Sequence, residues 1–361
     1  MKNNKYTVVD LFCGAGGLSK GFMDAGFDVV LGIDIDETSL NTFEKNHGNA
    51  VAMKLDLFNH DNINLIKKYL DDQNIDLDVL IGGPPCQGFS LAGKRDEFDK
   101  RNVLYSAMVK MANLIRPKVV LLENVPSILS LYDGIARKRI FEDFEELGYK
   151  MNVKILYAPE YGIPQIRRRA IFVGILNSEK EFEYPKPYLK ENEYITCLDA
   201  LSDLPSLDGD TDYSLDTVRE YISSPQSDYQ KLMRGNSILV YNHYPIKHAR
   251  KTIDNISKIP DGGNYKDLPK EEASKFKYHE SLHRYCSTKP SLTIDTGHRT
   301  HFHYKYNRIP TVRECARLQS FPDDFIFTGS KQQQYKQVGN AVPPLLGKAV
   351  ALSIKELLDN E

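Results

Sequence analysis

The first 150 residues alternate short apolar, β-branched runs with amphipathic stretches, and this alternation limits the fold more than any other feature. The apolar runs lie at 7–12, 28–34, 78–81 and 118–122. The stretches with helical periodicity lie at about 37–46, 62–70, 102–115 and 135–147. Strands and helices that alternate at this spacing form βαβ units around a mostly parallel, doubly wound sheet. We therefore expect an α/β, Rossmann-like fold in this part of the chain.

The regular pattern breaks down after about Ile175. The stretch 184–307 is rich in Pro, Gly, Ser, Asp and Tyr and has few long periodic segments, whereas a last apolar helix near the C-terminus is suited to pack on the first domain. A chain of 361 residues is also long for one compact core. We expect a first domain over 1–183, completed by 331–361, and a smaller, loop-rich domain over 184–330.

The charge is unevenly distributed along the chain. The formal net charge is only −2, yet the segment 231–308 holds 15 Lys and Arg against 7 Asp and Glu. Seven of the nine histidines and seven tyrosines also lie in this segment. Basic residues interleaved with aromatic ones are typical of nucleic-acid binding. A solvated basic face explains the charge equally well.

Several classes of protein are disfavoured. No apolar run approaches the roughly 20 residues that cross a bilayer, and the N-terminus has no signal-peptide pattern, so we expect a cytoplasmic protein without a membrane partner. The cysteines are odd in number and scattered, without metal-ligand spacing, which predicts reduced thiols and no metal site. They are Cys13, Cys86, Cys197, Cys286 and Cys315.

Glycines follow the first predicted strand, and a carboxylate ends the second. The segment 14–17 (Gly-Ala-Gly-Gly) lies between a strand and a helix, which allows a ligand to approach the backbone closely. Asp34 ends the next strand and is placed to accept hydrogen bonds from a ribose. Because the full G-x-G-x-x-G pattern is missing, an adenosyl cofactor is favoured over one with a pyrophosphate. The alternative is a tight turn that binds no ligand.

Cys86 follows two prolines at the end of another predicted strand. Pro84 and Pro85 restrict the backbone directly before the thiol, as a nucleophile that must point in one direction would require. The alternative is a buried, inert thiol. Glu123 ends the neighbouring strand; buried, it would donate a proton to a ring nitrogen, but it would equally cap a helix or pair with an arginine.

Six segments together resemble the DNA (cytosine-5) methyltransferase family, particularly its bacterial restriction–modification members. They occur in the order of the family's motifs and lie at both ends of the chain. The segments are 10–18, 83–90, 123–125, 165–169, 313–322 and 337–343. The resemblance implies a Rossmann-like methyltransferase fold that uses S-adenosylmethionine. It also implies that the basic, Tyr-rich stretch belongs to a target-recognition domain.

The resemblance further implies a mechanism. The target cytosine is flipped out of the duplex, and Cys86 adds to its C6 atom. Glu123 would hydrogen-bond N3 and the exocyclic amine, Arg169 would hold O2, and Arg167 would help to order the site. The methyl group then passes from S-adenosylmethionine to C5, and loss of the C5 proton releases Cys86.

The same resemblance assigns cofactor and DNA contacts. Asp34 matches the ribose contact, although many members have Glu followed by an aromatic residue where this chain has Asp34 and Ile35. The implied cofactor residues are Phe12, Gly14, Gly16, Gly17, Leu18, Asp34, Ile35, Asp56, Leu57, Pro84, Asn340 and Val342. The implied DNA contacts are Gln87, Ser90, Arg250, Arg284, Thr293 and Arg299. His298, His301 and His303 are expected to be solvated or to contact phosphate. The expected partners are double-stranded DNA and, in the same system, a cognate restriction endonuclease, with the methyltransferase itself a monomer.

Three rival interpretations remain at this point. An RNA cytosine-5 methyltransferase of the tRNA-modifying branch shares the motif set, but residues 86–90 fit the DNA branch better. A Rossmann oxidoreductase with a redox cysteine leaves the Pro-Pro-Cys and Arg-rich segments unexplained. A catalytically inactive DNA-binding relative is disfavoured because Cys86, Glu123 and Arg169 are all present.

Overall fold

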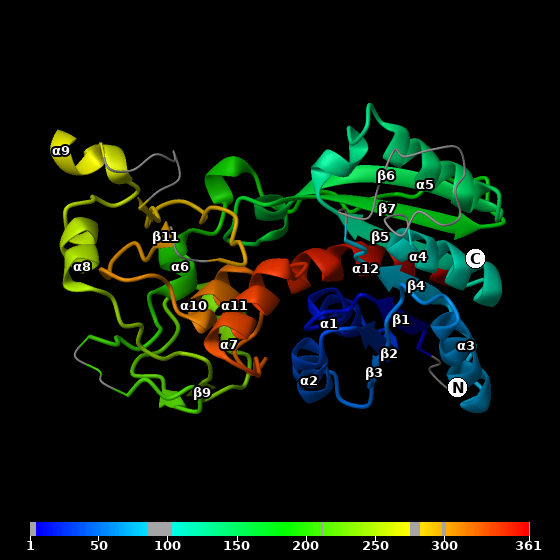
Figure 1. Ribbon diagram of the computed structural model, residues 1–361, viewed down its shortest axis with the longest axis horizontal. Coiled ribbons are helices and arrows are strands. Elements are labelled where there is room, and N and C mark those ends of the chain that lie inside the picture. The colour runs from blue at the N-terminus through cyan, green and yellow to red at the C-terminus, as the bar shows by residue number, and fades with distance from the viewer. Residues whose placement is uncertain are drawn as a thin grey trace. The chain divides into compact units, whose positions relative to one another are not determined.

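The computed structural model describes residues 5–85, 103–208, 210, 212–274, 282–297 and 301–360. They form two compact units (Figure 1). Unit 1 comprises Met1–Tyr157, Arg168–Lys186 and Leu346–Glu361, and unit 2 comprises Ala158–Arg167 and Pro187–Leu345. Compared with the expected limits, 158–167 and 331–345 therefore fall in the second unit. Hydrogen bonds explain the first difference, since Ile166 N donates to Ser291 O (2.7 Å) and Gln165 Nε2 to Leu318 O (3.2 Å).

A seven-stranded sheet forms the centre of unit 1 and confirms the expected α/β fold. Its order is β3-β2-β1-β4-β5-β7-β6. Among these described strands, β7 pairs antiparallel with β5 and β6 and is the one that runs opposite to the others. The strands are β1 (Thr7–Leu11), β2 (Asp28–Asp34), β3 (Val51–Lys54), β4 (Val79–Gly82), β5 (Val119–Asn124), β6 (Tyr149–Tyr157) and β7 (Arg168–Leu176). The apolar runs of the sequence become β1, β2, β4 and β5, which are buried on both faces as parallel strands usually are.

Helices cover both faces of this sheet. Alternate strand residues such as Leu31 and Ile33 join the core with α3 (Asn62–Asp72), α4 (Val103–Ile115) and α5 (Ile135–Glu145). On the opposite face, Gly32 lies against the Phe43 ring, which brings α2 close to β2. The helices on that side are α1 (Gly17–Asp24), α2 (Glu37–Asn46) and, packed on α1 through Gly347, α12 (Pro344–Asp359). The fold thus has three layers.

The strand order reverses between β1 and β4, which are hydrogen-bonded neighbours. The chain moves from β1 outward to β3 in one direction and from β4 to β5 in the other. In open α/β sheets, ligands bind outside the carboxyl ends of the strands at such a switch point. The glycine segment 14–17 follows β1, and Gly83 and Pro84 follow β4, so the suspected site residues lie at this edge.

Unit 2 consists of short elements joined by long loops. Its helices are α6 (Cys197–Leu201), α7 (Asp228–Arg234), α8 (Arg250–Ser257), α9 (Lys270–Ala273), α10 (Val312–Leu318) and α11 (Lys331–Asn340). Two small sheets pair β8 (Arg219–Glu220) with β9 (Leu239–Val240) and β10 (His283–Arg284) with β11 (His301–Phe302). Little regular structure is available to bury apolar surface here, and charged residues take part in the core.

The core of unit 2 contains an ionic network around Arg317. This side chain is fully buried and lies 2.9 Å from Asp203 and 2.6 Å from Asp323. Nearby, Arg308 makes a bidentate contact with Glu314 (2.6 and 2.7 Å). Burial of these charges is tolerated because each is paired and hydrogen-bonded. The Arg-Glu-Cys-Ala-Arg segment therefore stabilises unit 2 internally.

Among the described residues, no helix combines the length and apolarity required to cross a membrane.

Candidate active site

The loop after β1 has an unusual backbone that is fixed by Asp34. Phe12, Gly14 and Gly16 have φ angles of 65°, 54° and 88°, in the left-handed region. Gly14 N donates to Asp34 Oδ2 at 2.9 Å, and Asp36 N donates to Oδ1 at the same distance. Two main-chain donors therefore orient the Asp34 carboxylate, whose remaining lone pairs can accept from a ligand.

Gly16 is held so tightly that no other residue fits. It precedes α1, and a Cβ atom here would lie 2.2 Å from His47 Cε1 and 2.7 Å from Phe43 Cδ2. Gly17 and Leu18 continue into α1 and are buried. The glycine segment thus packs against α2 on its inner side.

The segment after β3 approaches the same edge of the sheet. Leu55 N donates to Asp34 O at 3.1 Å. Asp56 is exposed and accepts from Phe58 N at 2.9 Å, while Leu57 is buried. Ile35 is 57% exposed and Phe58 is 51% exposed. Phe58, which had no role in the sequence analysis, therefore adds an exposed aromatic ring directly after Asp56 and Leu57.

The ends of β4 and β5 lie side by side. Asn124 Nδ2 donates to Pro84 O at 2.9 Å, which fixes the proline segment against β5. A Cβ atom on Gly83 would lie 3.3 Å from Glu123 Oε2. Pro84 is buried and Pro85 is exposed. Cys86, Gln87 and Ser90 lie outside the described residues, so their roles stay predictions.

Glu123 and Arg169 form an ion pair at this edge. Arg169 Nε lies 2.6 Å from Glu123 Oε1, and the two side chains are 13% and 12% exposed. Arg169 also donates to Arg168 O at 2.8 Å. A carboxylate and a guanidinium that are partly shielded from water provide adjacent acceptors and donors, as recognition of a polar ring requires.

Arg167 belongs to unit 2 and differs from Arg169 in its surroundings. It is 2% exposed and donates to the carbonyl oxygens of Gly339 and Ala341 (both 3.1 Å) and Ile294 (3.2 Å). Its guanidinium therefore fastens its own segment of unit 2 to two others, at Ile294 and at 339–341. This arrangement fits an ordering role and not direct contact with a base.

Asn340 and Val342 also belong to unit 2. Asn340 is the exposed last residue of α11, and Val342 is 8% exposed. Their expected contact with a cofactor stays a prediction.

Asp10 is a buried carboxyl group to which sequence analysis gave no role. It is 1% exposed and accepts a hydrogen bond from Ser19 Oγ at 2.6 Å. Burial raises the pKa of Asp10 to about 7, and the nearby charges of Asp34 and Glu123 add to the increase. Part of the population is therefore protonated near neutral pH, at the centre of the edge that carries the other polar groups.

The residues suggested as DNA contacts have different surroundings. Arg250 is exposed at the start of α8. Thr293 is also exposed, and its Oγ1 donates to Ile166 O at 2.6 Å. Arg284 is only 5% exposed and donates to the carbonyl oxygens of Ile256 (2.7 Å) and His303 (3.1 Å). A structural role accounts for Arg284, so we do not carry it forward as a DNA contact. Arg299 lies outside the described residues.

The expectation of solvated histidines is wrong for His301 and His303. They are 6% and 1% exposed. His303 Nδ1 accepts from the backbone N–H groups of Lys305 (3.0 Å) and Tyr306 (3.2 Å), and burial lowers its pKa to about 3. The ring thus holds a turn together in neutral form. His298 lies outside the described residues.

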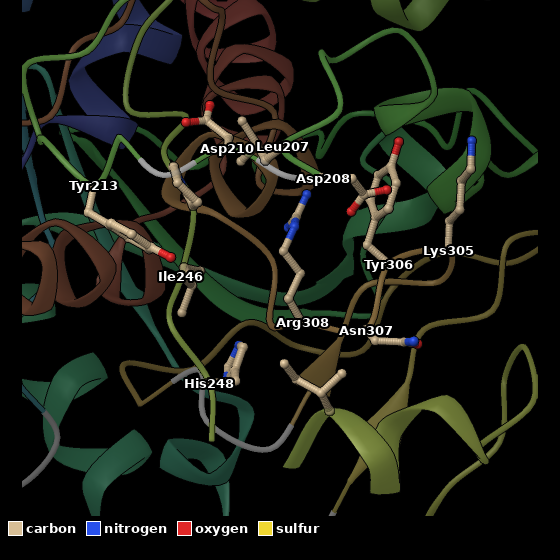
Figure 2. A pocket seen from close by; sticks show the side chains of 12 residues that line it. Leu207, Asp208, Asp210, Tyr213, Ile246, His248, Lys305, Tyr306, Asn307 and Arg308 are labelled. Atoms are coloured by element: carbon tan, nitrogen blue, oxygen red, sulfur yellow. The ribbon is translucent and has the colours of Figure 1, made fainter. Parts of the chain in front are cut away.

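A hollow in unit 2 lies between three loops, as Figure 2 shows. Asp208, Asp210, His248, Lys305 and Arg308 line it together with apolar residues. Two of these charges have internal partners, since Asp210 lies 2.5 Å from Arg219 and Arg308 pairs with Glu314. Of the suggested DNA contacts, Arg250, Arg284 and Thr293 are among the described residues, and none of these three lines the hollow. Within the described residues there is also no cluster of three or more His, Cys, Asp or Glu suited to a metal ion.

Comparison with known families gives a match over almost the whole chain. The family model described as C-5 cytosine-specific DNA methylase matches residues 6–356. The Type II methyltransferase M1.HphI of Haemophilus parahaemolyticus is 37% identical over 358 residues, which cover 98% of this chain and 88% of the relative. The Type II methyltransferase M.DdeI of Desulfomicrobium norvegicum is 35% identical over 378 residues, covering 98% and 89%.

Solved structures of two methyltransferases are similar to this chain. A crystal structure described as a DNA modification methyltransferase encoded within an E. coli prophage has a TM-score of 0.79 and 26% identity, and the match covers 98% of this chain and all of the other. The S. pombe Dnmt2 methyltransferase has a TM-score of 0.59 and 18% identity, with 99% of each chain covered. The second likeness concerns the fold alone.

Proposed function

The chain belongs to the C-5 cytosine-specific DNA methylase family and is a DNA (cytosine-5) methyltransferase, and from this premise we propose how it works. We propose that it methylates C5 of a cytosine flipped out of duplex DNA, with S-adenosylmethionine as the methyl donor and Cys86 as the nucleophile. Its similarity to Type II methyltransferases supports a place in a restriction–modification system. The observation that carries the proposal is the Glu123–Arg169 pair beside the Gly83–Pro84 segment that leads to Cys86.

The residues at the carboxyl ends of β1, β2 and β3 fit S-adenosylmethionine. A Cβ atom on Gly14 would meet nothing within 4 Å, so the loop is open to a ligand there. Asp34 offers a fixed carboxylate for a ribose, and Ile35 offers an exposed apolar surface for an adenine. Phe12, Gly14, Gly17, Leu18, Asp56, Leu57 and Pro84 complete the set of unit 1 residues that we propose for this site. When bound, S-adenosylmethionine would supply an electrophilic methyl group.

The chain's own residues would activate the cytosine. The Cys86 thiolate would form a bond to C6, which makes C5 a carbon nucleophile. Glu123 would donate a hydrogen to N3 and accept one from the exocyclic amine, and Arg169 would donate to O2. The donors at N3 and O2 would withdraw electrons from C6 as the sulfur attacks. After C5 is methylated, loss of its proton and cleavage of the S–C6 bond would restore the thiolate.

Binding of DNA is assigned to the loop-rich unit 2. Arg250 and Thr293 are exposed there, and the segment 231–308 is strongly basic. We propose that these residues contact the phosphate backbone, together with Arg299, and that Gln87 and Ser90 contact the DNA around the flipped base. A cognate restriction endonuclease would cut the same sequence without a need to bind this monomeric enzyme. Since cellular DNA is the substrate, we infer that the enzyme works in the cytoplasm.

Covalent trapping tests this proposal. A duplex with 5-fluorocytosine at the target position blocks the last step, because the fluorine takes the place of the C5 proton that must leave. Target positions are first located by bisulfite sequencing of DNA from cells that express the protein. We expect a denaturation-resistant complex with the wild-type protein in the presence of S-adenosylmethionine and none with Cys86→Ala.

The control is cofactor binding, which Cys86→Ala should leave intact. Methyl transfer from labelled cofactor to duplex DNA and to tRNA is measured in parallel. Label that appears only in tRNA, or full activity of Cys86→Ala, would overturn the proposal.

A further inference from the structure

His47 lies directly beneath the glycine loop, although no proposed role includes it. The side chain follows α2 and is 1% exposed. Its Nε2 lies 2.9 Å from Gly16 O, and its Nδ1 lies 2.7 Å from Phe43 O. The ring therefore connects the end of α2 with the loop between β1 and α1.

The imidazole ring of His47 also packs tightly against the glycine loop. It stacks on Phe43 with ring centres 4.0 Å apart and an angle of 6° between the planes. A Cβ atom at Gly16 would lie 2.2 Å from the ring. Since Phe43 itself contacts Gly32 of β2, the position of the imidazole is determined by the packing of α2 on the sheet. The glycine loop therefore packs against a side chain whose position is fixed.

The chemistry of the contact requires a donor. A carbonyl oxygen only accepts, so a ring nitrogen must donate its hydrogen to Gly16 O. Burial lowers the pKa of His47. The charge of Lys20 also lowers this pKa, whereas the charge of Asp24 raises it. A neutral imidazole has one N–H and can donate to one of the two carbonyl oxygens at a time. The tautomer with hydrogen on Nε2 would donate to Gly16 O, and the tautomer with hydrogen on Nδ1 would donate to Phe43 O.

We propose that His47 is a positioning residue for cofactor binding, which holds the Gly16 peptide in its left-handed conformation by donation from Nε2. The Gly16 carbonyl is two residues from Gly14, whose N–H is bound by Asp34. His47 and Asp34 thus hold the two ends of one short loop, one by a donor and the other by an acceptor. The inference rests on the proposed S-adenosylmethionine site.

Three substitutions at His47 distinguish the contributions of the two ring nitrogens to cofactor binding. His47→Gln retains an amide N–H near the position of Nε2, whereas His47→Asn retains one near the position of Nδ1. His47→Phe retains an aromatic ring for stacking but has no donor. Equilibrium dialysis with labelled S-adenosylmethionine gives the dissociation constant, and steady-state methylation gives kcat and the KM for the cofactor.

We expect His47→Gln to bind the cofactor within about 2-fold of the wild type. His47→Asn and His47→Phe should bind about 3- to 10-fold more weakly, the range for one net hydrogen bond. At saturating cofactor, kcat should stay within about 2-fold in all three, and DNA affinity should be unchanged. This split between KM and kcat, with rescue by Gln alone, separates positioning of the loop from a general structural role.

Other outcomes overturn the inference. Equal cofactor affinity in the Gln and Asn variants would do so, as would a fall in kcat with KM unchanged. Loss of folding in the Asn and Phe variants, detected by circular dichroism, would show that the hydrogen bond from Nε2 supports the whole fold and not the cofactor loop in particular. If the wild-type protein does not bind S-adenosylmethionine, the proposed function fails, which is a different result from equal binding by wild type and variants.

Discussion

Arg169 Nε lies 2.6 Å from Glu123 Oε1 across the adjacent strands β7 and β5, with both side chains about one-eighth exposed. The same carboxylate borders Gly83, two residues before Pro85. A base that enters here would meet an acceptor and a donor that are already oriented by each other. Each group would have to exchange part of this pair for a contact with the base, so the pair couples catalysis to stability.

Substitution of Glu123 should affect chemistry more than folding. We expect Glu123→Gln to lower kcat by about 100-fold or more, the usual effect of losing a group that transfers or holds a proton, while the affinity for S-adenosylmethionine stays within about 2-fold. Single-turnover methylation measures the first quantity and equilibrium dialysis the second. Arg169→Ala is the matched variant: it leaves Glu123 unpaired, so it should lower both kcat and the melting temperature. Wild-type kcat in Glu123→Gln would contradict the proposed role.

Asp10 should make the protein less stable as pH rises. The folded-state pKa of about 7 lies above the ordinary aspartate pKa of 3.8, so between these values the folded state binds more protons than the unfolded state. The linkage relation then makes the free energy of unfolding fall with increasing pH across this window. Asn resembles the protonated carboxyl group and can still accept from Ser19. We expect Asp10→Asn to remove this slope and to be the more stable protein at pH 8, by up to roughly 4 kcal/mol at about 1.4 kcal/mol per pKa unit.

Urea unfolding of both proteins at pH 5 and pH 8 measures this difference. Equal pH dependence in the wild type and in Asp10→Asn would show that Asp10 titrates normally.

Arg250 and Arg284 provide a matched comparison of an exposed and a buried arginine. Arg250→Ala should weaken DNA binding and reduce the slope of log affinity against log salt by about 1, if Arg250 contacts one phosphate. Its effect on the free energy of unfolding should stay within about 0.5 kcal/mol. Arg284→Ala should instead destabilise the protein, by roughly 1–3 kcal/mol for each carbonyl oxygen left without a donor.

Fluorescence anisotropy at several salt concentrations and urea unfolding measure the two effects. If Arg284→Ala reduces the slope of log affinity against log salt and leaves the free energy of unfolding unchanged, Arg284 contacts DNA and has no structural role.

The difference between these two arginines shows where inference from the sequence ends. The strands of unit 1 followed from local patterns: the apolar run 28–34 is β2, with the same limits. Because parallel strands end at one edge, residues that follow neighbouring strands lie close together, as Glu123, Asn124 and Pro84 do. Such relations depend on periodicity and strand order, which can be inferred from the amino-acid sequence.

Burial of a charged or polar side chain in unit 2 depends on loops that are distant in the sequence. Arg284 is covered because Ile256 and His303 present their carbonyl oxygens to it. In unit 1, likewise, His47 meets Gly16 only because α2 packs on β2 next to the glycine loop. No local pattern encodes these contacts, so they had to come from the structure.

Arg317 should be among the residues on which the stability of unit 2 depends most. Its guanidinium is fully buried between Asp203 and Asp323 and also donates to Ala200 O at 2.7 Å. Arg317→Met removes the closest positive charge from Asp323, which keeps Arg313 at 3.8 Å, whereas Asp203 keeps Arg234 at 2.6 Å. A buried carboxylate that loses its close partner typically costs about 3–5 kcal/mol. Lys336→Met on the exposed side of α11 is the control, and it should change the free energy of unfolding by less than about 0.5 kcal/mol.

Neutralising Asp323 tests the mechanism of this loss. When Asp323→Asn is added to Arg317→Met, the double variant should be more stable than Arg317→Met alone, because the carboxylate that lost its close cation is gone while Asp203 keeps its pair with Arg234. Urea unfolding at pH 7, followed by tyrosine fluorescence and circular dichroism, gives the free energies. If the double variant is less stable than Arg317→Met, the side chain acts through packing and hydrogen bonds to the main chain, and charge compensation is not what stabilises this core.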